Sequence, residues 1–149
     1  MADKYFKIRE AEELLPMIGL YLKEAREHKQ RVDGLNEELS HASARIMVLG
    51  GSIPPHNELS QKKAERDEIA THVQDAVSKI LETGCLVKDL DEGLVDFPTL
   101  LNGEEAYLCW KLGEKHIGYW HGIQEGFAGR KPLDDSPSDE APPGPKRIQ

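Results

Sequence analysis

The chain has 149 residues, of which 38% are hydrophobic and 31% are charged, a composition that suits one core with long solvent-exposed helices rather than several domains. Its formal net charge of −8 excludes general nucleic-acid binding and attraction to an anionic membrane surface, because both need clustered lysine and arginine. No apolar run approaches the roughly 20 residues that a membrane-spanning helix needs.

The first residues of the chain lack the basic and then apolar pattern of a signal peptide. The two cysteines, Cys85 and Cys109, form neither a CxxC motif nor a disulfide framework, which is typical of a reducing compartment. We therefore expect a cytoplasmic protein.

Apolar residues between Leu14 and Leu49 recur at alternating spacings of four and three residues, which indicates a coiled-coil helix. Proline is accepted in the first turn of a helix but disrupts its interior. Pro16 therefore predicts a short helix over Ile8–Leu15, a kink, and a long helix that begins near Pro16. His28 occupies one position of the apolar seam, where a polar residue helps to fix the register of packed helices.

Residues 50–55, which include two glycines and two prolines, end the long helix. A second amphipathic segment extends to about Glu82 and stops at Gly84. The short connection makes the two helices antiparallel neighbours, so residues 1–84 are predicted to form a helical hairpin with a short N-terminal helix. Because two helices bury only one stripe each, we expect a second copy of the chain to cover the rest of the seam in a homodimer.

The apolar runs become shorter after Gly84. The segments Cys85–Leu90 and Leu94–Phe97, joined by a loop that ends in Gly93, predict a β-hairpin. Asn102-Gly103 is a strong signal for a second turn. Residues 85–133 are therefore predicted to form a small antiparallel β module, which makes the protein α+β: a coiled-coil-like hairpin followed by a sheet.

Two further strands are predicted over Glu105–Leu112 and Ile117–His121. A turn centred on residues 114 and 115 would place Trp110 opposite Tyr119 and Leu108 opposite His121. Beyond this module, residues 134–149 are rich in proline, serine and acidic residues and are almost free of apolar ones. This C-terminal tail is predicted to be disordered.

Several motifs of the chain resemble those of a known family. They are Glu10-Ala11 with Leu14-Leu15-Pro16, Lys88-Asp89-Leu90-Asp91 followed by Gly93-Leu94-Val95-Asp96-Phe97-Pro98, Tyr107-Leu108-Cys109-Trp110 with Gly113-Glu114, Tyr119-Trp120-His121, Gly126-Phe127 and Gly129-Arg130. The chain up to Leu133 resembles an uncharacterised bacterial family catalogued as a domain of unknown function (DUF2203-like). The resemblance implies a helical hairpin followed by a small β region, and it implies no activity.

A candidate binding site follows from the segment that holds both tryptophans. We expect Glu114, His121 and Arg130 to converge beside Trp110 and Tyr119, because these residues flank the last two strands and a glycine-bearing loop can bring Arg130 back over the sheet. They would form either a recognition site or an internal ion-pair network.

The loop that carries Arg130 has two interpretations. Its glycines let backbone amides approach an anion, and two cations follow them, although it is not a phosphate-binding P-loop. Arg130 could instead pair inside the fold with Asp89, Asp96 or Glu114.

A divalent metal is a possible cofactor, with Glu114, His116 and His121 as its ligands, since these residue types bind zinc and iron. Their spacing matches no established ligand motif, and the alternative is that His121 is a strand histidine hydrogen-bonded within the fold. No residue is assigned a catalytic role, because a cysteine between Leu108 and Trp110 is most often a small buried hydrophobe.

The sequence therefore favours a non-enzymatic interaction module that self-associates through its helical hairpin. The alternative is a protein that binds a small ligand or a divalent metal, either as a binding protein or as an enzyme, with its site in the β module. No partner other than a second copy of the chain is indicated.

Overall fold

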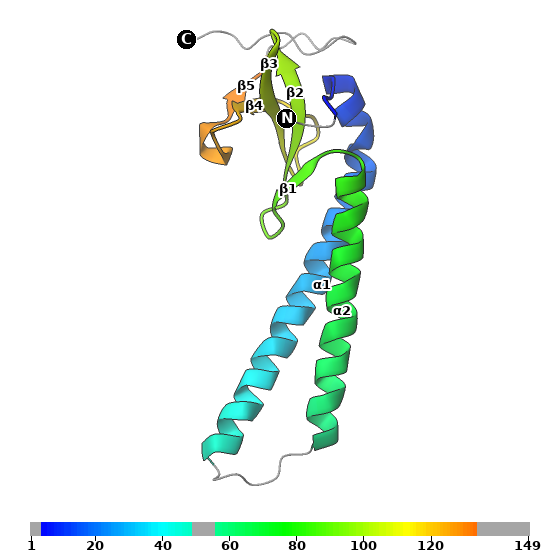
Figure 1. The fold of residues 1–149 in the computed structure, drawn as a ribbon, viewed down its shortest axis with the longest axis vertical. Coiled ribbons are helices and arrows are strands. Elements are labelled where there is room, and N and C mark those ends of the chain that lie inside the picture. Colours follow the sequence, from blue (N-terminus) through cyan, green and yellow to red (C-terminus); the bar gives the residue numbers. More distant parts are fainter. Residues whose placement is uncertain (1–3, 49–55, 134–149) are drawn as a thin grey trace.

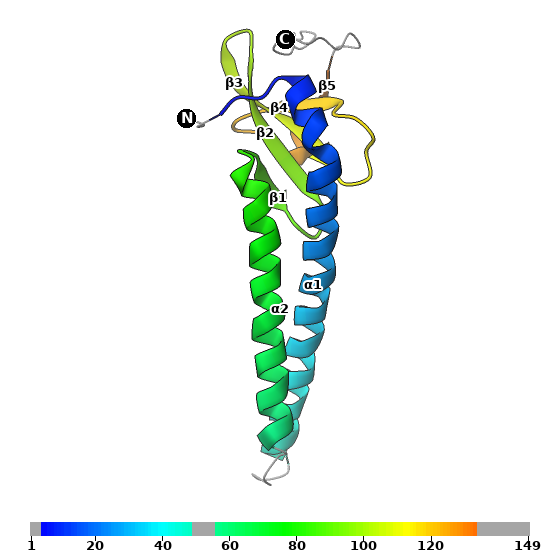
Figure 2. The same ribbon diagram turned by 90° about the vertical axis from the view of Figure 1, so that its right-hand side faces the viewer.

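The computed structural model describes residues 4–48 and 56–133, in which a long helical hairpin carries an antiparallel sheet at one end (Figures 1 and 2). Its elements are α1 (Ile8–Val48), α2 (His56–Glu82), β1 (Leu86–Asp89), β2 (Leu94–Leu101), β3 (Glu104–Lys111), β4 (Tyr119–Gly122), the short 3-10 helix η1 (Phe127–Gly129) and β5 (Lys131–Pro132). The five strands lie in chain order, each antiparallel to the next. The predicted α+β class is confirmed, and the predicted disordered tail lies outside the described residues.

The predicted break at Pro16 is wrong, because α1 is one continuous helix with Pro16 inside it. A proline in a helix interior costs about 3 kcal/mol or more, partly through its missing N–H. On both sides of Pro16, however, α1 buries the same apolar face, including Leu15, Ile18 and Leu22. Each such side chain contributes about 1.5–3 kcal/mol, so the packing of this face outweighs the local cost of the proline.

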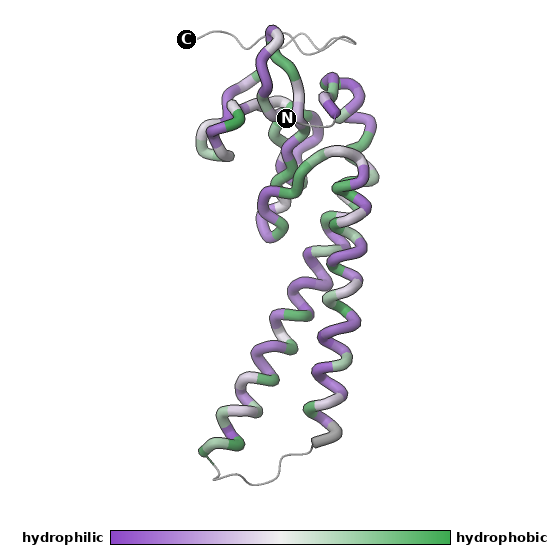
Figure 3. Tube along the Cα trace, in the orientation of Figure 1, coloured by the Kyte–Doolittle hydropathy of each residue, from purple (hydrophilic) through white to green (hydrophobic). Residues whose placement is uncertain are grey.

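The two helices form the predicted antiparallel hairpin. His28 faces His72 across it, with the ring centroids 5.4 Å apart, so His28 lies at the helix interface as expected. Ion pairs between Arg31 and Glu65 and between Lys62 and Glu38 link the helices farther along. Figure 3 shows mostly hydrophilic residues along the hairpin, with hydrophobic residues recurring between them.

Among the described residues, neither helix contains an apolar stretch long enough to cross a bilayer. The buried residues of α1 are Ile8, Ala11, Leu15, Ile18, Leu22, Ala25, Leu35 and Leu39. In the described part of α2 only Ala76 and Ile80 are buried. The apolar stripe of α2 is therefore much narrower than that of α1.

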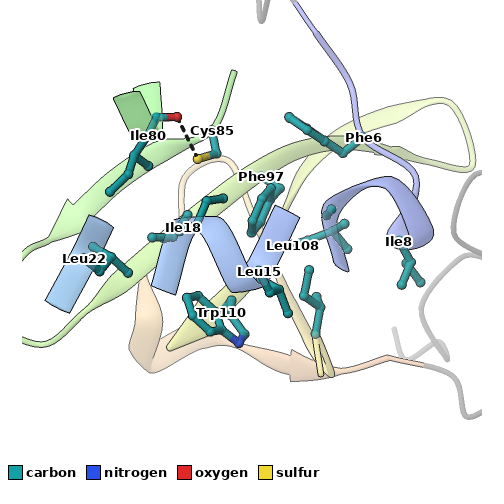
Figure 4. Close-up of a cluster of buried hydrophobic side chains, with 13 residues drawn as sticks. Phe6, Ile8, Leu15, Ile18, Leu22, Ile80, Cys85, Phe97, Leu108 and Trp110 are labelled. Atoms are coloured by element: carbon teal, nitrogen blue, oxygen red, sulfur yellow. Dashed lines mark hydrogen bonds between the residues drawn. The ribbon is translucent and has the colours of Figure 1, made fainter. Parts of the chain in front are cut away.

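The core forms where α1 and the end of α2 meet one face of the sheet. Figure 4 shows Phe97 and Leu108 of the sheet among side chains from α1 and α2. Phe6, from the segment before α1, packs edge-to-face on Phe97 with the ring centroids 5.3 Å apart. Alternation along β2 and β3 then places the residues between these core positions on the opposite face of the sheet, away from the helices.

Both predicted turns are present. The loop before Gly93 joins β1 to β2, and Gly93 has a φ of +72°. Asn102 and Gly103 join β2 to β3 with φ values of +53° and +83°, the two positive values that a type I′ hairpin turn requires. Strand β2 extends past its predicted end through Pro98, whose carbonyl accepts a 2.7 Å hydrogen bond from the N–H of Phe6.

The predicted register of β3 and β4 is wrong by one residue. Tyr119 lies opposite Cys109 rather than Trp110, and His121 lies opposite Tyr107 rather than Leu108. The strands are joined by a long loop over residues 112–118 instead of a tight turn. A slip of one residue exchanges the two faces of a strand, so Tyr119 and His121 lie on the sheet face that turns away from the helices.

Candidate functional site

Three polar side chains are buried together on the sheet face away from the helices. Asp96 on β2 is the cross-strand partner of Cys109 on β3, and His121 follows on β4. Their exposed fractions are 2%, 1% and 2%. One ligand atom from each, a carboxylate oxygen, a thiol sulfur and an imidazole nitrogen, lies within 4.8 Å of the others. We call these residues the Asp-Cys-His cluster.

The hydrogen bonds of His121 define the orientation of its ring. Nδ1 lies 2.9 Å from the carbonyl oxygen of Gly122, and Nε2 lies 3.0 Å from Oδ2 of Asp96. Because a carbonyl oxygen only accepts hydrogen bonds, Nδ1 carries a proton and donates it. The contact between Nε2 and Asp96 then also holds one proton, which either group can carry.

Burial affects the ionisation of the other two groups. It raises the pKa of the Asp96 carboxyl, and the neighbouring His121 opposes that rise. It also raises the pKa of the Cys109 thiol from 9.0 to about 11, with a further contribution from the negative charge of Asp96. Cys109 is therefore a neutral thiol at neutral pH. Since both ring nitrogens of His121 are engaged elsewhere, His121 is not positioned as a base for Cys109.

A second polar group lies beside this cluster. Arg130 pairs with Glu114 through two hydrogen bonds of 3.0 Å, and it donates a third, of 3.3 Å, to the backbone carbonyl of Cys109. Its guanidinium lies 3.9 Å from the ring centroid of Tyr119 and 4.5 Å from that of Phe127. The loop thus returns Arg130 to the sheet as predicted, and of the three acidic partners left open it takes Glu114.

The predicted binding residues are brought only partly together. Glu114, Arg130 and Tyr119 are in contact, and the indole N–H of Trp110 donates a 2.9 Å hydrogen bond to the backbone carbonyl of Glu114. The ring of Trp110 belongs to the core on the helix side of the sheet. His121 instead joins the Asp-Cys-His cluster, and Arg130 contacts that cluster through the Cys109 backbone.

The predicted metal ligands Glu114, His116 and His121 are not brought together. The side chain of His116 is 81% exposed, and its Nδ1 lies 3.7 Å from a carboxylate oxygen of Glu12 on α1. Glu114 is occupied by Arg130. Within residues 4–48 and 56–133, the three-residue group whose ligand atoms converge is Asp96, Cys109 and His121.

Asp96 was missed as a site residue, although the sequence contains a signal for it. It lies between Val95 and Phe97, in a run that reads as a buried strand. A carboxylate in such a run needs a charged, hydrogen-bonded or metal partner. The incorrect register hid that partner, because it placed His121 opposite Leu108 and thus on the other face.

Comparison with known proteins places the fold in a family. Neither a curated protein nor a solved structure matches the chain. A family model described as "Uncharacterized conserved protein (DUF2203)" matches residues 4–133, which span the hairpin and the whole sheet. The chain therefore belongs to the DUF2203 family of uncharacterized conserved proteins.

Proposed function

We propose that this protein binds a divalent transition-metal ion through Asp96, Cys109 and His121. The observation that supports the proposal most directly is the convergence of three ligand atoms within 4.8 Å, on three neighbouring strands. Sulfur, imidazole nitrogen and carboxylate oxygen are the donors that zinc takes in proteins. The mixed donor set also excludes magnesium and calcium, which prefer oxygen ligands alone.

The surroundings of the cluster support a metal site. The carbonyl of Gly122 holds the Nδ1 proton of His121, so Nε2 is the nitrogen directed at Asp96. Such a second hydrogen bond orients the ring of most metal-binding histidines. A metal ion would displace the proton shared by His121 and Asp96 and the proton of Cys109, and its charge would compensate the burial of both anions. Three protein ligands leave one tetrahedral position for water or a further ligand.

A purely structural hydrogen-bond network is the alternative. It accounts for the contact between Asp96 and His121, but apolar residues of similar volume would stabilise the sheet equally well or better. The thiol of Cys109, which is hydrogen-bonded to Asp96, would be the third member of such a network. A metal ion accounts for all three residues at once.

Metal analysis of protein purified without a histidine tag or chelator tests the proposal. We expect one zinc ion per chain, or stoichiometric uptake of Zn²⁺ by the apo-protein, and a thiolate-to-metal absorption band when Co²⁺ is bound. Cys109→Ala and His121→Ala should abolish uptake. Cys85→Ala is the matched control, because Cys85 is also buried and free but lies outside the cluster, and it should bind normally. Failure of the wild-type protein to take up either ion would refute the proposal.

We also propose that the hairpin is an interaction module through which two copies of the chain form a homodimer in the cytoplasm. Support comes from Leu20, which is 70% exposed on α1 in a shallow groove that Met17 and Tyr21 also line. Because α2 covers the seam at Leu35 and Leu39, we place the second copy at the groove around Leu20.

Light scattering at high micromolar concentration tests this second proposal. The wild-type protein should have the mass of a dimer, and Leu20→Asp should have the mass of a monomer while keeping its helical content. Glu24→Gln, on the rim of the same groove, is the control and should remain dimeric. A monomeric wild-type protein would exclude the homodimer.

A further inference from the structure

A groove with a volume of about 660 Å³ crosses the sheet face away from the helices. It begins at the end of α2, near Leu81, passes over Leu86 and Pro98, and ends beside Tyr107 and Ile123. Tyr107 separates it from the Asp-Cys-His cluster, since its ring lies 5.5 Å from the ring of His121. The volume is in the range of sites that bind small molecules, about 300–1,000 Å³.

Apolar side chains form most of the wall of this groove. Leu86 and Pro98 line its floor, and the rings of Tyr5 and Tyr107 add flat apolar surface. Leu81 and Ile123, at its two ends, are 45% and 51% exposed. Large aliphatic side chains exposed at both ends of one groove leave apolar surface in water, which the apolar body of a ligand would remove.

The charge in the groove comes from Glu105. It is the one Asp, Glu, Lys or Arg residue among the lining residues. Its carboxylate accepts a hydrogen bond from the hydroxyl of Tyr5, and no lysine or arginine of the described residues forms an ion pair with it. A carboxylate can accept several hydrogen bonds at once, so Glu105 retains the capacity to accept more.

Lys88 lies beside the groove but is not one of its lining residues. Its ammonium group is 5.3 Å from the ring centroid of Tyr107, where an aromatic ring attracts a cation to its face. The charge among the lining residues is therefore the negative charge of Glu105, and a cationic ligand group would meet it in a chain whose net charge is −8.

We propose that this groove binds a small organic amine, with the ammonium group on the carboxylate of Glu105 and the apolar body over Leu86 and Tyr107. The proposal does not depend on the metal, because none of the three cluster residues lines the groove.

An NMR titration with 2-phenylethylamine tests the proposal. We expect saturable chemical-shift changes of the backbone amides of Leu81, Ala106 and Ile123, all of which line the groove. The probe 3-phenylpropionate has a similar shape and the opposite charge, and it should bind at least about tenfold more weakly, as expected for loss of a charge-assisted contact. Equal binding of the two probes, or no binding of the amine at millimolar concentration, would overturn the proposal.

Two variants separate the charge of Glu105 from general effects. Glu105→Gln keeps an acceptor for Tyr5 but removes the negative charge, and it should weaken binding of the amine about tenfold. Glu104→Gln is the matched control, because Glu104 is exposed and does not line the groove, and it should bind as the wild-type protein does. Unchanged affinity in Glu105→Gln would refute the assignment. Cys109→Ala should still bind the amine, which separates this site from the metal site.

Discussion

The buried thiol of Cys109 predicts a specific dependence of stability on pH in the metal-free protein. Burial raises its pKa from 9.0 to about 11 in the folded protein. The folded state therefore holds the thiol proton more tightly than the unfolded state does. This contribution to stability is fully present below about pH 9 and is lost as the pH rises towards about pH 11.

The size of the effect follows from the difference between the two pKa values. One pKa unit corresponds to about 1.4 kcal/mol. With values of 9.0 and about 11, the thiol loses about 2 kcal/mol of its contribution between about pH 8 and about pH 11. Removal of the thiol in Cys109→Ala removes this dependence, while the small cavity it leaves costs the same at every pH.

Urea unfolding of the wild type and Cys109→Ala, with chelator and reductant present, measures the effect. Tyrosines and lysines titrate in the same range, but they are common to both proteins and cancel in the difference. The free energy of unfolding of the wild type relative to Cys109→Ala should fall by about 2 kcal/mol between about pH 8 and about pH 11. A difference that does not change with pH would show that Cys109 ionises equally easily in both states, and it would refute the reasoning.

Three further substitutions, two of them with a matched control, test the fold by chemical denaturation. Arg130→Ala should lower the free energy of unfolding by about 2 kcal/mol, because it breaks a partly buried bidentate ion pair. A decrease below about 0.5 kcal/mol would show that the pair is only a surface contact. Leu35→Ala should cost about 2–5 kcal/mol, since Leu35 is 1% exposed, whereas Leu20→Ala, at 70% exposure, should change stability by less than about 0.5 kcal/mol. Gly93→Ala should lower the free energy of unfolding by at least about 1 kcal/mol, because Gly93 has a φ of +72°. Gly118→Ala is the control and should lower it less, because Gly118 has no positive φ and a Cβ added there would meet open space.

Local signals predicted the local features of this fold correctly. The Asn102-Gly103 turn follows from the ability of both residues to adopt positive φ. The long apolar seam of α1 predicted that this helix packs against a second helix in a hairpin. The continuity of α1 through Pro16 could not be predicted, because it depends on a core formed with strands that lie far away in the sequence.

The candidate site was predicted in part for the same reason. The glycine-bearing loop indicated that Arg130 returns to the sheet, and it does so at Glu114. The partner of His121 depends on strand register, and the register depends on how the loop over residues 112–118 closes. Ile117 in this loop is 4% exposed and joins the core, and its N–H donates a 2.9 Å hydrogen bond to the carboxylate of Glu12. This tertiary contact leaves no sign in the alternation of the strands.

Both helices of the hairpin contact the core at the same end of the arm. Leu22 on α1 and Ile80 on α2 are the core residues of each helix that lie farthest along the arm. Past the ion pair of Lys29 with Asp91, the described contacts of the arm join its own two helices, as in the pair of Lys62 and Glu38. Removing or adding one heptad in each helix would keep these helices in register. The length of the arm can thus change without any change in the sheet or in the core that the sheet forms with the helices.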